Sequence, residues 1–532
     1  MSAASGGAVQ TVRRVITYTL LFVMVVLAST GLSGLLTRLL NLGNDIITDD
    51  SSGLAEALAF TLIAGPLAAV LWWLVWRGLS DDRDRTSVAW ALYLAFASTV
   101  ALIVAANSLL SAVASLVGGR SLTAEFATGL VWAAVWLWHR WMQSHQGKRP
   151  SRLVGVTSVV GSLYGLAIGV GGAVGALARL VSAATDAVTD VVTIGGVPWE
   201  DVVQSLVWAA GGALIWWWHW SRDGAARLRS GFARVALVVI TGLGASALCL
   251  AGIGITLYVL LRLAFDSSDS LAERLDPLGF GLAAALVGAL VWVYHRRVVA
   301  AEVSAVREAT RLVTSGVALA AAASGVGVIV NALLAALGRP LAEGDLTALL
   351  LGGLSALIVG GPAWWLFWKP LSQREQQGAS GRRTYLVAIF GVSALVALIT
   401  LILIAFRLFE FGLDNVSGES VLERVRAPLG LLTATLLVAG YHFAIWRREA
   451  AEAPARAVLA QVVIVTASDA DPLRRAIDER FGASVTVWKR ADAVDSTVDP
   501  DQLLDALAGI SARKALVVLG PDSRMEVVPL EG

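Results

Sequence analysis

The sequence predicts an all-α polytopic membrane domain of about 12 transmembrane helices, followed by a small C-terminal α/β domain. Hydrophobic residues make up 57% of the 532 residues and charged residues 15%, compared with about 25% in soluble domains. After Arg456 the composition becomes that of a soluble protein. The net charge of +1 argues against a nucleic-acid binder, and the single cysteine, Cys249, excludes a disulfide framework and a cysteine-based metal site.

Twelve apolar stretches have the length of about 20 residues that a bilayer crossing requires. They form a membrane domain over residues 15–450, preceded by an N-terminal segment, 1–14. The predicted spans are 15–40, 54–76, 87–117, 121–141, 153–183, 200–220, 234–265, 276–295, 312–338, 345–368, 384–409 and 427–446.

Two marks recur along these spans and indicate six helical hairpins in tandem. The second helix of each pair ends in a tryptophan-rich segment, such as Trp216 to Trp220, and the first helix carries Arg or Asn toward its end. All six hairpins enter the bilayer from the same side, so they are parallel repeats. The predicted hairpins are about 13–81, 85–145, 150–224, 227–300, 302–373 and 382–450.

The charges of the connectors orient the hairpins. Connectors between hairpins hold 24 Lys and Arg but 9 Asp and Glu, whereas connectors within hairpins and their flanks hold 5 and 19. Short loops rich in Lys and Arg stay in the cytoplasm. We therefore expect a multi-pass protein of the cell inner (plasma) membrane with both termini cytoplasmic and with acidic outer loops.

Each repeat also has a characteristic start and end. The first opens with Arg13-Arg14-x-x-x-Tyr18, and several close with a Trp-x-x-His-Trp-like sequence. Over residues 13–450 this pattern resembles a family of uncharacterised bacterial multi-pass membrane proteins, built from tandem two-helix repeats of a domain of unknown function. The resemblance implies a repeated membrane fold and does not imply any particular activity. Val75 and Phe367 depart from the pattern, because they replace the histidine in the first and fifth repeats.

One repeat position forms a polar series at the outer helix ends: Arg38, Asn107, Arg179, Arg262, Asn331 and Arg407. A helix from Arg14 to Arg38 would be about 36 Å long, which exceeds the hydrocarbon core of about 30 Å. Two interpretations follow. These side chains anchor the helices at the outer boundary, or, if the hairpins close into a ring, they form a polar outer mouth that binds anions or anionic lipid headgroups.

A second repeat position, at the cytoplasmic helix ends, holds four histidines: His139, His219, His295 and His442. A cationic ring there suits the helix dipole, so a capping or interface role is favoured over a proton-linked role. A metal site would need two or three of these rings within about 2 Å of one ion. We predict no metal site, no cofactor and no catalytic residue.

The C-terminal segment predicts a βαβαββ domain over residues 461–532, joined by a linker at 451–460. Strands are expected at 461–466, 485–488, 515–519 and 525–530, and helices at 470–481 and 500–510. Asp499 before Pro500 is an expected helix cap, and Ser468 and Asp469 are cap candidates for the first helix.

The sequence favours two functions. The first is a repeat-built membrane scaffold or sensor whose cytoplasmic domain binds a protein partner. The alternative is a channel or a lipid- or anion-handling protein with a polar outer mouth. No GxSxG, HExxH or intramembrane carboxylate pair is present, which argues against an enzyme and against ion-coupled transport. Beyond the lipid bilayer, the expected partners are an anionic lipid or anion and a cytoplasmic protein, and no nucleic acid.

Overall fold

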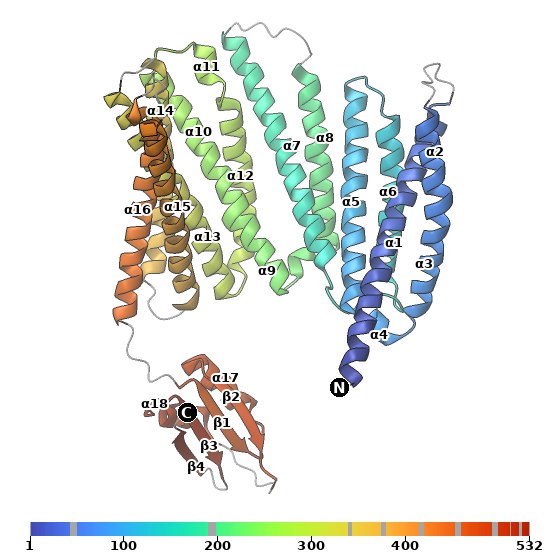
Figure 1. The fold of residues 1–532 in the computed structure, drawn as a ribbon, viewed down its shortest axis with the longest axis vertical. Coiled ribbons are helices and arrows are strands. Elements are labelled where there is room, and N and C mark those ends of the chain that lie inside the picture. The colour runs from blue at the N-terminus through green and yellow to red at the C-terminus, as the bar shows by residue number, and fades with distance from the viewer. Residues whose placement is uncertain are drawn as a thin grey trace. The chain divides into compact units, whose positions relative to one another are not determined.

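The structure, a computed structural model, describes residues 2–42, 50–189, 198–338, 343–373, 379–413, 420–452, 459–491, 498–510, 512–520 and 524–530. The chain divides into two compact units, Met1–Gly440 and Tyr441–Gly532. The described part of the first unit is helical (Figure 1).

The six expected hairpins account for nearly all helices. Their first helices are α1 (Ser2–Leu40), α5 (Val88–Val117), α7 (Val156–Thr189), α9–η4–α10 (Gly231–Val238, Val239–Ala245 and Ser246–Phe265), α13 (Ser304–Leu337) and α15 (Ala379–Leu413). Their second helices are α2–η1–α3 (Ser51–Ala59, Phe60–Ala64 and Gly65–Gly78), α6 (Thr123–Ser144), α8–η2 (Pro198–Trp217 and Trp218–Arg222), α12 (Leu278–Ala300), α14 (Glu343–Gln373) and α16 (Val421–Glu452). The connectors contain the short helices α4 (Asp82–Arg85), η3 (Ala225–Arg227) and α11 (Leu271–Leu275).

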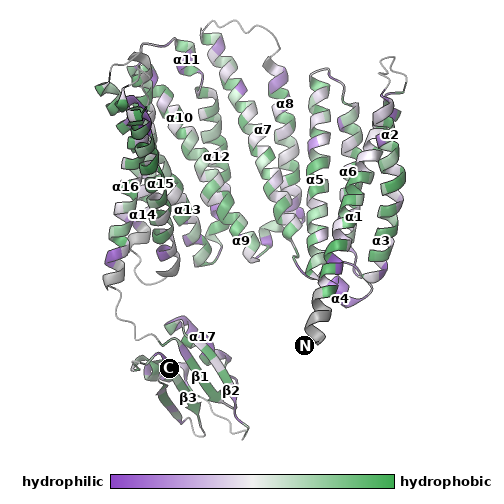
Figure 2. Ribbon diagram, viewed as in Figure 1, coloured by the Kyte–Doolittle hydropathy of each residue, from purple (hydrophilic) through white to green (hydrophobic). Residues whose placement is uncertain are grey.

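All twelve predicted spans are therefore helical, and hydrophobic residues cover most of their length (Figure 2). Within the described residues, ten helices are long and apolar enough to cross a membrane, two fewer than the sequence predicts. The two that fall short are α6 and α8. Their tryptophans add little hydropathy, and α6 also contains His139 and Arg140, while α8 has Glu200 and Asp201 in its first turn. Both still pack along α5 and α7 as second helices.

The hairpins form an open row in sequence order (Figure 1). The first packs on the second through α1 and α6, the second on the third through α5 and α8, and the third on the fourth through α7 and α12. The fourth packs on the fifth through α10 and α14, and the fifth on the sixth through α13 and α15. Among the described residues, no extensive packing joins the sixth hairpin to the first.

The connectors between successive hairpins lie at one end of the helices, which we call the basic end. The connectors within hairpins lie at the opposite end of the helices, which we call the acidic end. The basic end of the first two hairpins has a dense aromatic core. Tyr18 of α1 stacks on Tyr93 of α5 with ring centroids 5.6 Å apart, and Trp90 lies 5.7 Å from both rings. Met142 of α6 completes this core and is fully buried.

The second unit contains a four-stranded sheet. Its strands are β1 (Gln461–Thr466), β2 (Ser484–Lys489), β3 (Lys514–Leu519) and β4 (Met525–Leu530), and its helices are α17 (Asp471–Phe481) and α18 (Pro500–Ala508). The spatial order is β2-β1-β3-β4, with β1 parallel to β2 and β3, and β4 antiparallel to β3.

One face of this sheet forms the core of the α/β domain. Ile464 and Val517, on neighbouring strands, are fully buried with Ile477 of α17 and Leu503 of α18. Burial alternates along β1 and β3, so the opposite face is only partly covered. The predicted strand and helix order is confirmed.

The two expected caps in this domain have different outcomes. Asp499 is the N-cap of α18, and its carboxylate accepts a hydrogen bond from the backbone N–H of Asp501. The first helix begins later than predicted, with Ala470 at the N-cap position and Pro472 in its first turn. The Asp469 carboxylate instead accepts from the backbone N–H of Asp471 at 3.0 Å, which forms a turn before the helix.

Candidate functional site

The polar series at the acidic end does not lie uniformly at helix ends. Arg38 is in the last turn of α1, but α5 continues past Asn107 to Val117 and α7 continues past Arg179 to Thr189. For these two residues the expected position at a helix end is wrong. The segments that follow them consist mostly of small and apolar residues that extend the helix.

The series makes mostly local contacts. The Arg38 guanidinium lies 2.6 Å from the Asp50 carboxylate, which caps α2 in the same hairpin. Backbone N–H of Gly53 and the Ser52 hydroxyl donate to Asp50 and, together with Arg38, hold the pKa of that carboxyl below its usual range. The cation of the first repeat is therefore neutralised inside its own hairpin.

Other members of the series have different partners. Arg179 donates to the hydroxyl of Ser205 on α8 at 3.0 Å. Asn331 of the fifth hairpin accepts from Arg426 of the sixth at 3.2 Å. In the described part of the chain, Asn107 and Arg407 have no side-chain hydrogen bond. The structure therefore does not gather the six side chains around one point.

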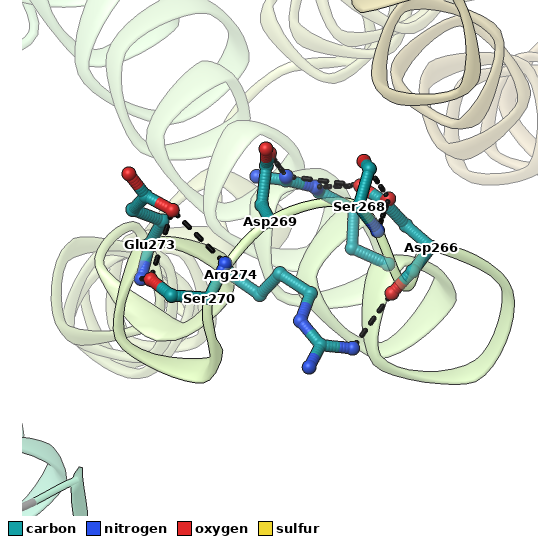
Figure 3. A network of polar contacts seen from close by, with 7 residues as sticks. Asp266, Ser268, Asp269, Ser270, Glu273 and Arg274 are labelled. Carbon is teal, nitrogen blue, oxygen red and sulfur yellow. Dashed lines mark hydrogen bonds and ion pairs between the residues drawn. The ribbon is translucent and has the colours of Figure 1, made fainter. Parts of the chain in front are cut away.

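Among the described residues, Arg262 belongs to a dense polar network at the acidic end, and Figure 3 shows the loop residues of that network. This buried guanidinium donates to Asp266 at 2.9 Å and also pairs with Asp269. The Ser268 hydroxyl and backbone N–H, and then Arg262, hold the pKa of the Asp266 carboxyl below its usual range despite its burial. Two carboxylates balance one cation here, so the loop between α10 and α11 needs no external anion.

A capping box extends this network into α11. The Ser270 hydroxyl accepts from the backbone N–H of Glu273, and the Glu273 carboxylate accepts from the backbone N–H of Ser270 at 2.9 Å. Arg274 reaches back to the carbonyl oxygen of Asp266 at 2.6 Å (Figure 3). The acidic residues of this loop therefore stabilise a turn and a helix start.

The repeat histidines are buried between helices. His139, His219 and His295 are 0%, 4% and 1% exposed. Nδ1 of His139 and of His295 bonds to the carbonyl oxygen four residues earlier, at Val135 and Val291, over 2.8 and 2.9 Å. His442 lies in α16, ten residues before its end. In the first unit this repeat position is thus an interior packing position.

The same position connects successive hairpins. A tryptophan of one hairpin meets the ring at the histidine position of the next, edge to face, in three interfaces. Ring centroids are 6.3 Å apart for Trp136 and His219, 6.2 Å for Trp216 and His295, and 6.2 Å for Trp292 and Phe367. The sequence shows that the position recurs, but the contact between hairpins becomes visible only in the structure.

The interface of the second and third hairpins has a charged cluster at the basic end. Arg140 donates two hydrogen bonds to Asp223, at 2.8 and 2.5 Å, and His219 Nδ1 lies 2.8 Å from the same carboxylate. Burial raises the pKa of Asp223, but the His219 hydrogen bond and the Arg140 charge outweigh it, so this pKa lies below its usual value. Sequence analysis missed this pair because its members are 83 residues apart.

A cavity of about 980 Å³ adjoins this cluster. Its lining includes Arg85, Arg149 and Arg222 as well as the Arg140–Asp223 pair. The equivalent interface of the third and fourth hairpins is filled instead, since the buried Glu302 carboxylate pairs with Arg229 and Arg234 there. Among the described residues, no group of three or more His, Cys, Asp or Glu side chains is placed to hold a metal ion.

Comparisons with known proteins agree with the repeat. A family model described as Domain of unknown function (DUF5671) matches residues 14–137, 155–279 and 308–439. The first and third matched segments span roughly two hairpins each, the second spans the third hairpin and the first helix of the fourth, and together they cover more than half of the chain. A search of curated proteins and a search of solved structures found no match. Three tandem matches over the helical hairpins show that this chain belongs to the DUF5671 family, whose domain has no known function.

Proposed function

We propose that the protein is a membrane scaffold in which packed hairpins carry a cytoplasmic α/β domain that binds a protein partner. The observation that supports this most directly is the backbone-to-backbone packing within hairpins. A methyl group added to Gly212 of α8 would lie 2.1 Å from the backbone nitrogen of Gly169 of α7. Small residues at such contacts allow two helices to approach without intervening side chains.

The same packing recurs in the next two hairpins. A methyl group on Gly252 of α10 would lie 2.1 Å from the backbone nitrogen of Ala285 of α12. One on Gly325 of α13 would lie 2.6 Å from that of Leu357 of α14. Contacts this close leave no path between the two helices of a hairpin, which favours a rigid support over a channel.

The cytoplasmic side is assigned from charge. The connectors at the basic end carry the excess of Lys and Arg, and such loops remain in the cytoplasm. The α/β domain follows α16, whose last residues, Arg447 and Arg448 among them, belong to the same basic set. This domain has its own core and leaves the opposite face of its sheet only partly covered, a surface suited to a protein partner.

A photocrosslinking experiment in intact cells tests this proposal. A photoreactive phenylalanine analogue replaces Trp488 of the edge strand β2, which is 59% exposed. The matched control replaces Trp199 in α8 at the acidic end, which is 56% exposed. We expect a discrete adduct with a cytoplasmic protein at position 488 and none at 199. Adducts with periplasmic or extracellular proteins at 488, or no discrete adduct, would overturn the proposal.

Flux measurements separate the scaffold from the channel alternative. The full-length protein in liposomes should release entrapped potassium chloride no faster than protein-free liposomes. Release that rises with the protein content, and that falls when Gly212→Leu disrupts the third hairpin, would favour a channel instead.

A further inference from the structure

A second cavity, of about 420 Å³, lies at the basic end of the interface between the fourth and fifth hairpins. It is built from α12, the start of α13, the π-helical segment η4 and the end of α14. The corresponding elements of the second and third hairpins surround the Arg140–Asp223 cluster. Four arginines line the cavity: Arg296, Arg297, Arg307 and Arg311.

The cations of this cavity have no carboxylate partner among the described residues. No Asp or Glu appears in the described lining, and none of the four arginines forms an ion pair there. Arg296 lies over the Trp292 ring at 4.7 Å, and Arg307 donates to the backbone carbonyl of Glu302. Four guanidinium groups around one cavity repel one another unless an anion neutralises them.

Comparison with the second and third hairpins explains the missing carboxylate. The ring contacts put Trp292 and Phe367 in register with Trp136 and His219. In that register Arg296 corresponds to Arg140, and Leu371 corresponds to Asp223. The carboxylate that neutralises Arg140 and the histidine that pairs with that carboxylate are therefore both replaced by apolar residues. The position of the internal anion is lost, while the arginine is retained.

Thr241 supplies an independent indication of a ligand. It lines the cavity from η4 and is 0% exposed, and among the described residues its Oγ1 has no hydrogen-bond partner. A buried hydroxyl without a partner is costly, so such groups are normally bonded to protein or ligand. π-helical turns such as η4 are frequent at functional sites.

The geometry points to a phosphate-binding site in this cavity, with Arg296 and Arg311 pairing the phosphate oxygens and Thr241 donating to the bound group. Arginine guanidinium groups bind phosphate through paired N–H donors. The phosphate belongs either to the headgroup of an anionic phospholipid or to a soluble phosphate. The aromatic walls formed by Trp292 and Phe367 accommodate the apolar part of a lipid. This site is independent of the scaffold proposal, which rests on the packing within hairpins and on the α/β domain.

Native mass spectrometry of the full-length protein in detergent tests the site. The probes are phosphatidylglycerol, neutral phosphatidylcholine and inorganic phosphate. Arg296→Gln with Arg311→Gln should weaken phosphatidylglycerol binding about tenfold or more, because two charge-assisted hydrogen-bonding groups are lost. Displacement of the lipid by millimolar inorganic phosphate would assign the site to a soluble phosphate. Binding of phosphatidylglycerol that phosphate does not displace would assign it to a lipid headgroup.

Two further variants make the result specific. Ala300→Asp adds a carboxylate to the cavity lining without removing an arginine, and it should also weaken binding about tenfold. Arg77→Gln with Arg83→Gln is the matched control. It removes two exposed basic-end charges, and Arg77 also lies over a tryptophan ring, that of Trp73, at 4.7 Å. Equal loss in this control, or unchanged binding in both cavity variants, would overturn the proposal.

Discussion

At the residue scale, the charged groups of the membrane unit are neutralised partly by local partners and partly by partners far away in the sequence. The repeats mark Arg262 and His219 as special positions, and this much is readable from the chain alone. Arg262 pairs with carboxylates four and seven residues away, which a helix end followed by an acidic loop makes predictable. Arg140 and Asp223 meet across two hairpins, and no local pattern encodes such a contact.

Asp223→Asn should destabilise the protein by about 1–3 kcal/mol at pH 7, because it weakens charged hydrogen bonds to a buried group. The folded-state pKa of Asp223 is lowered, so its pairing stabilises the protein above the ordinary carboxyl pKa of about 4. This contribution disappears as the pH falls through the lowered pKa. Melting temperatures at pH 7 and pH 3 should therefore differ less in the variant than in the wild type.

Asp82→Asn is the matched control for this prediction. Asp82 also pairs with an arginine, Arg85, at 2.7 Å, but its side chain is 81% exposed. Exposed ion pairs contribute little to stability, so the melting temperature should hardly change. Equal effects of the two substitutions would contradict the role assigned to Asp223.

At the element scale, all twelve predicted spans form helices, because long apolar runs and glycine spacing are local properties of the chain. The π-helical segments η1, η2 and η4 are not predicted. η1 ends at Ala64, two residues before Pro66, which has no N–H to donate to the preceding turn. The glycines of α7 show how one helix serves two environments, since Gly172 is buried and its neighbour Gly171 is exposed.

Gly172→Ala and Gly171→Ala form a matched pair on adjacent positions. A methyl group at 172 would lie 2.3 Å from the backbone nitrogen of Ala209, whereas at 171 it would meet nothing within 4 Å. We expect the first change to destabilise the protein by about 1–3 kcal/mol through overpacking. The second should be neutral or stabilising by up to about 1 kcal/mol, since alanine favours helix. Thermal unfolding in detergent measures both, and identical melting temperatures would contradict the packing described.

At the scale of the whole molecule, the sequence identifies two parts and their internal order, but not how the hairpins associate. A polar ring around a mouth requires the sixth hairpin to meet the first, and the described helices form an open row instead. Repeat patterns identify the helices of each hairpin. Which hairpins pack against one another depends on side chains that come from separate repeats. The order of strands and helices in the α/β domain can be predicted from the sequence, because strands, caps and turns are encoded by residues close together in the chain.

Residues 457–532 should fold without the membrane unit, because their buried cluster is self-contained. Expressed alone, this segment should give a cooperative thermal transition in circular dichroism. Val462→Ala should lower the transition more than Val463→Ala, since Val462 is fully buried and the adjacent Val463 is only partly covered. A disordered spectrum would contradict independent folding. The segment is small, so its stability should be modest.

Cysteine labelling tests the orientation of the hairpins. Ser121→Cys at the acidic end and Ser151→Cys at the basic end are both exposed, and each is introduced into a Cys249→Ala background. In intact cells a membrane-impermeant maleimide should modify position 121 and not 151, because the basic loops remain inside. After permeabilisation both should react. Modification of 151 in intact cells would reverse the assigned topology.

The edge-to-face ring contact between neighbouring hairpins has a consequence for how the protein family diversifies. Trp136 with His219, Trp216 with His295 and Trp292 with Phe367 use the same geometry at the three central junctions. A closed ring of hairpins has a fixed number of members, but an open row can gain or lose a hairpin at a junction whose contact geometry is repeated. Gene duplication can therefore add hairpins without redesigning an interface, and each added junction is then free to exchange an internal carboxylate for a ligand.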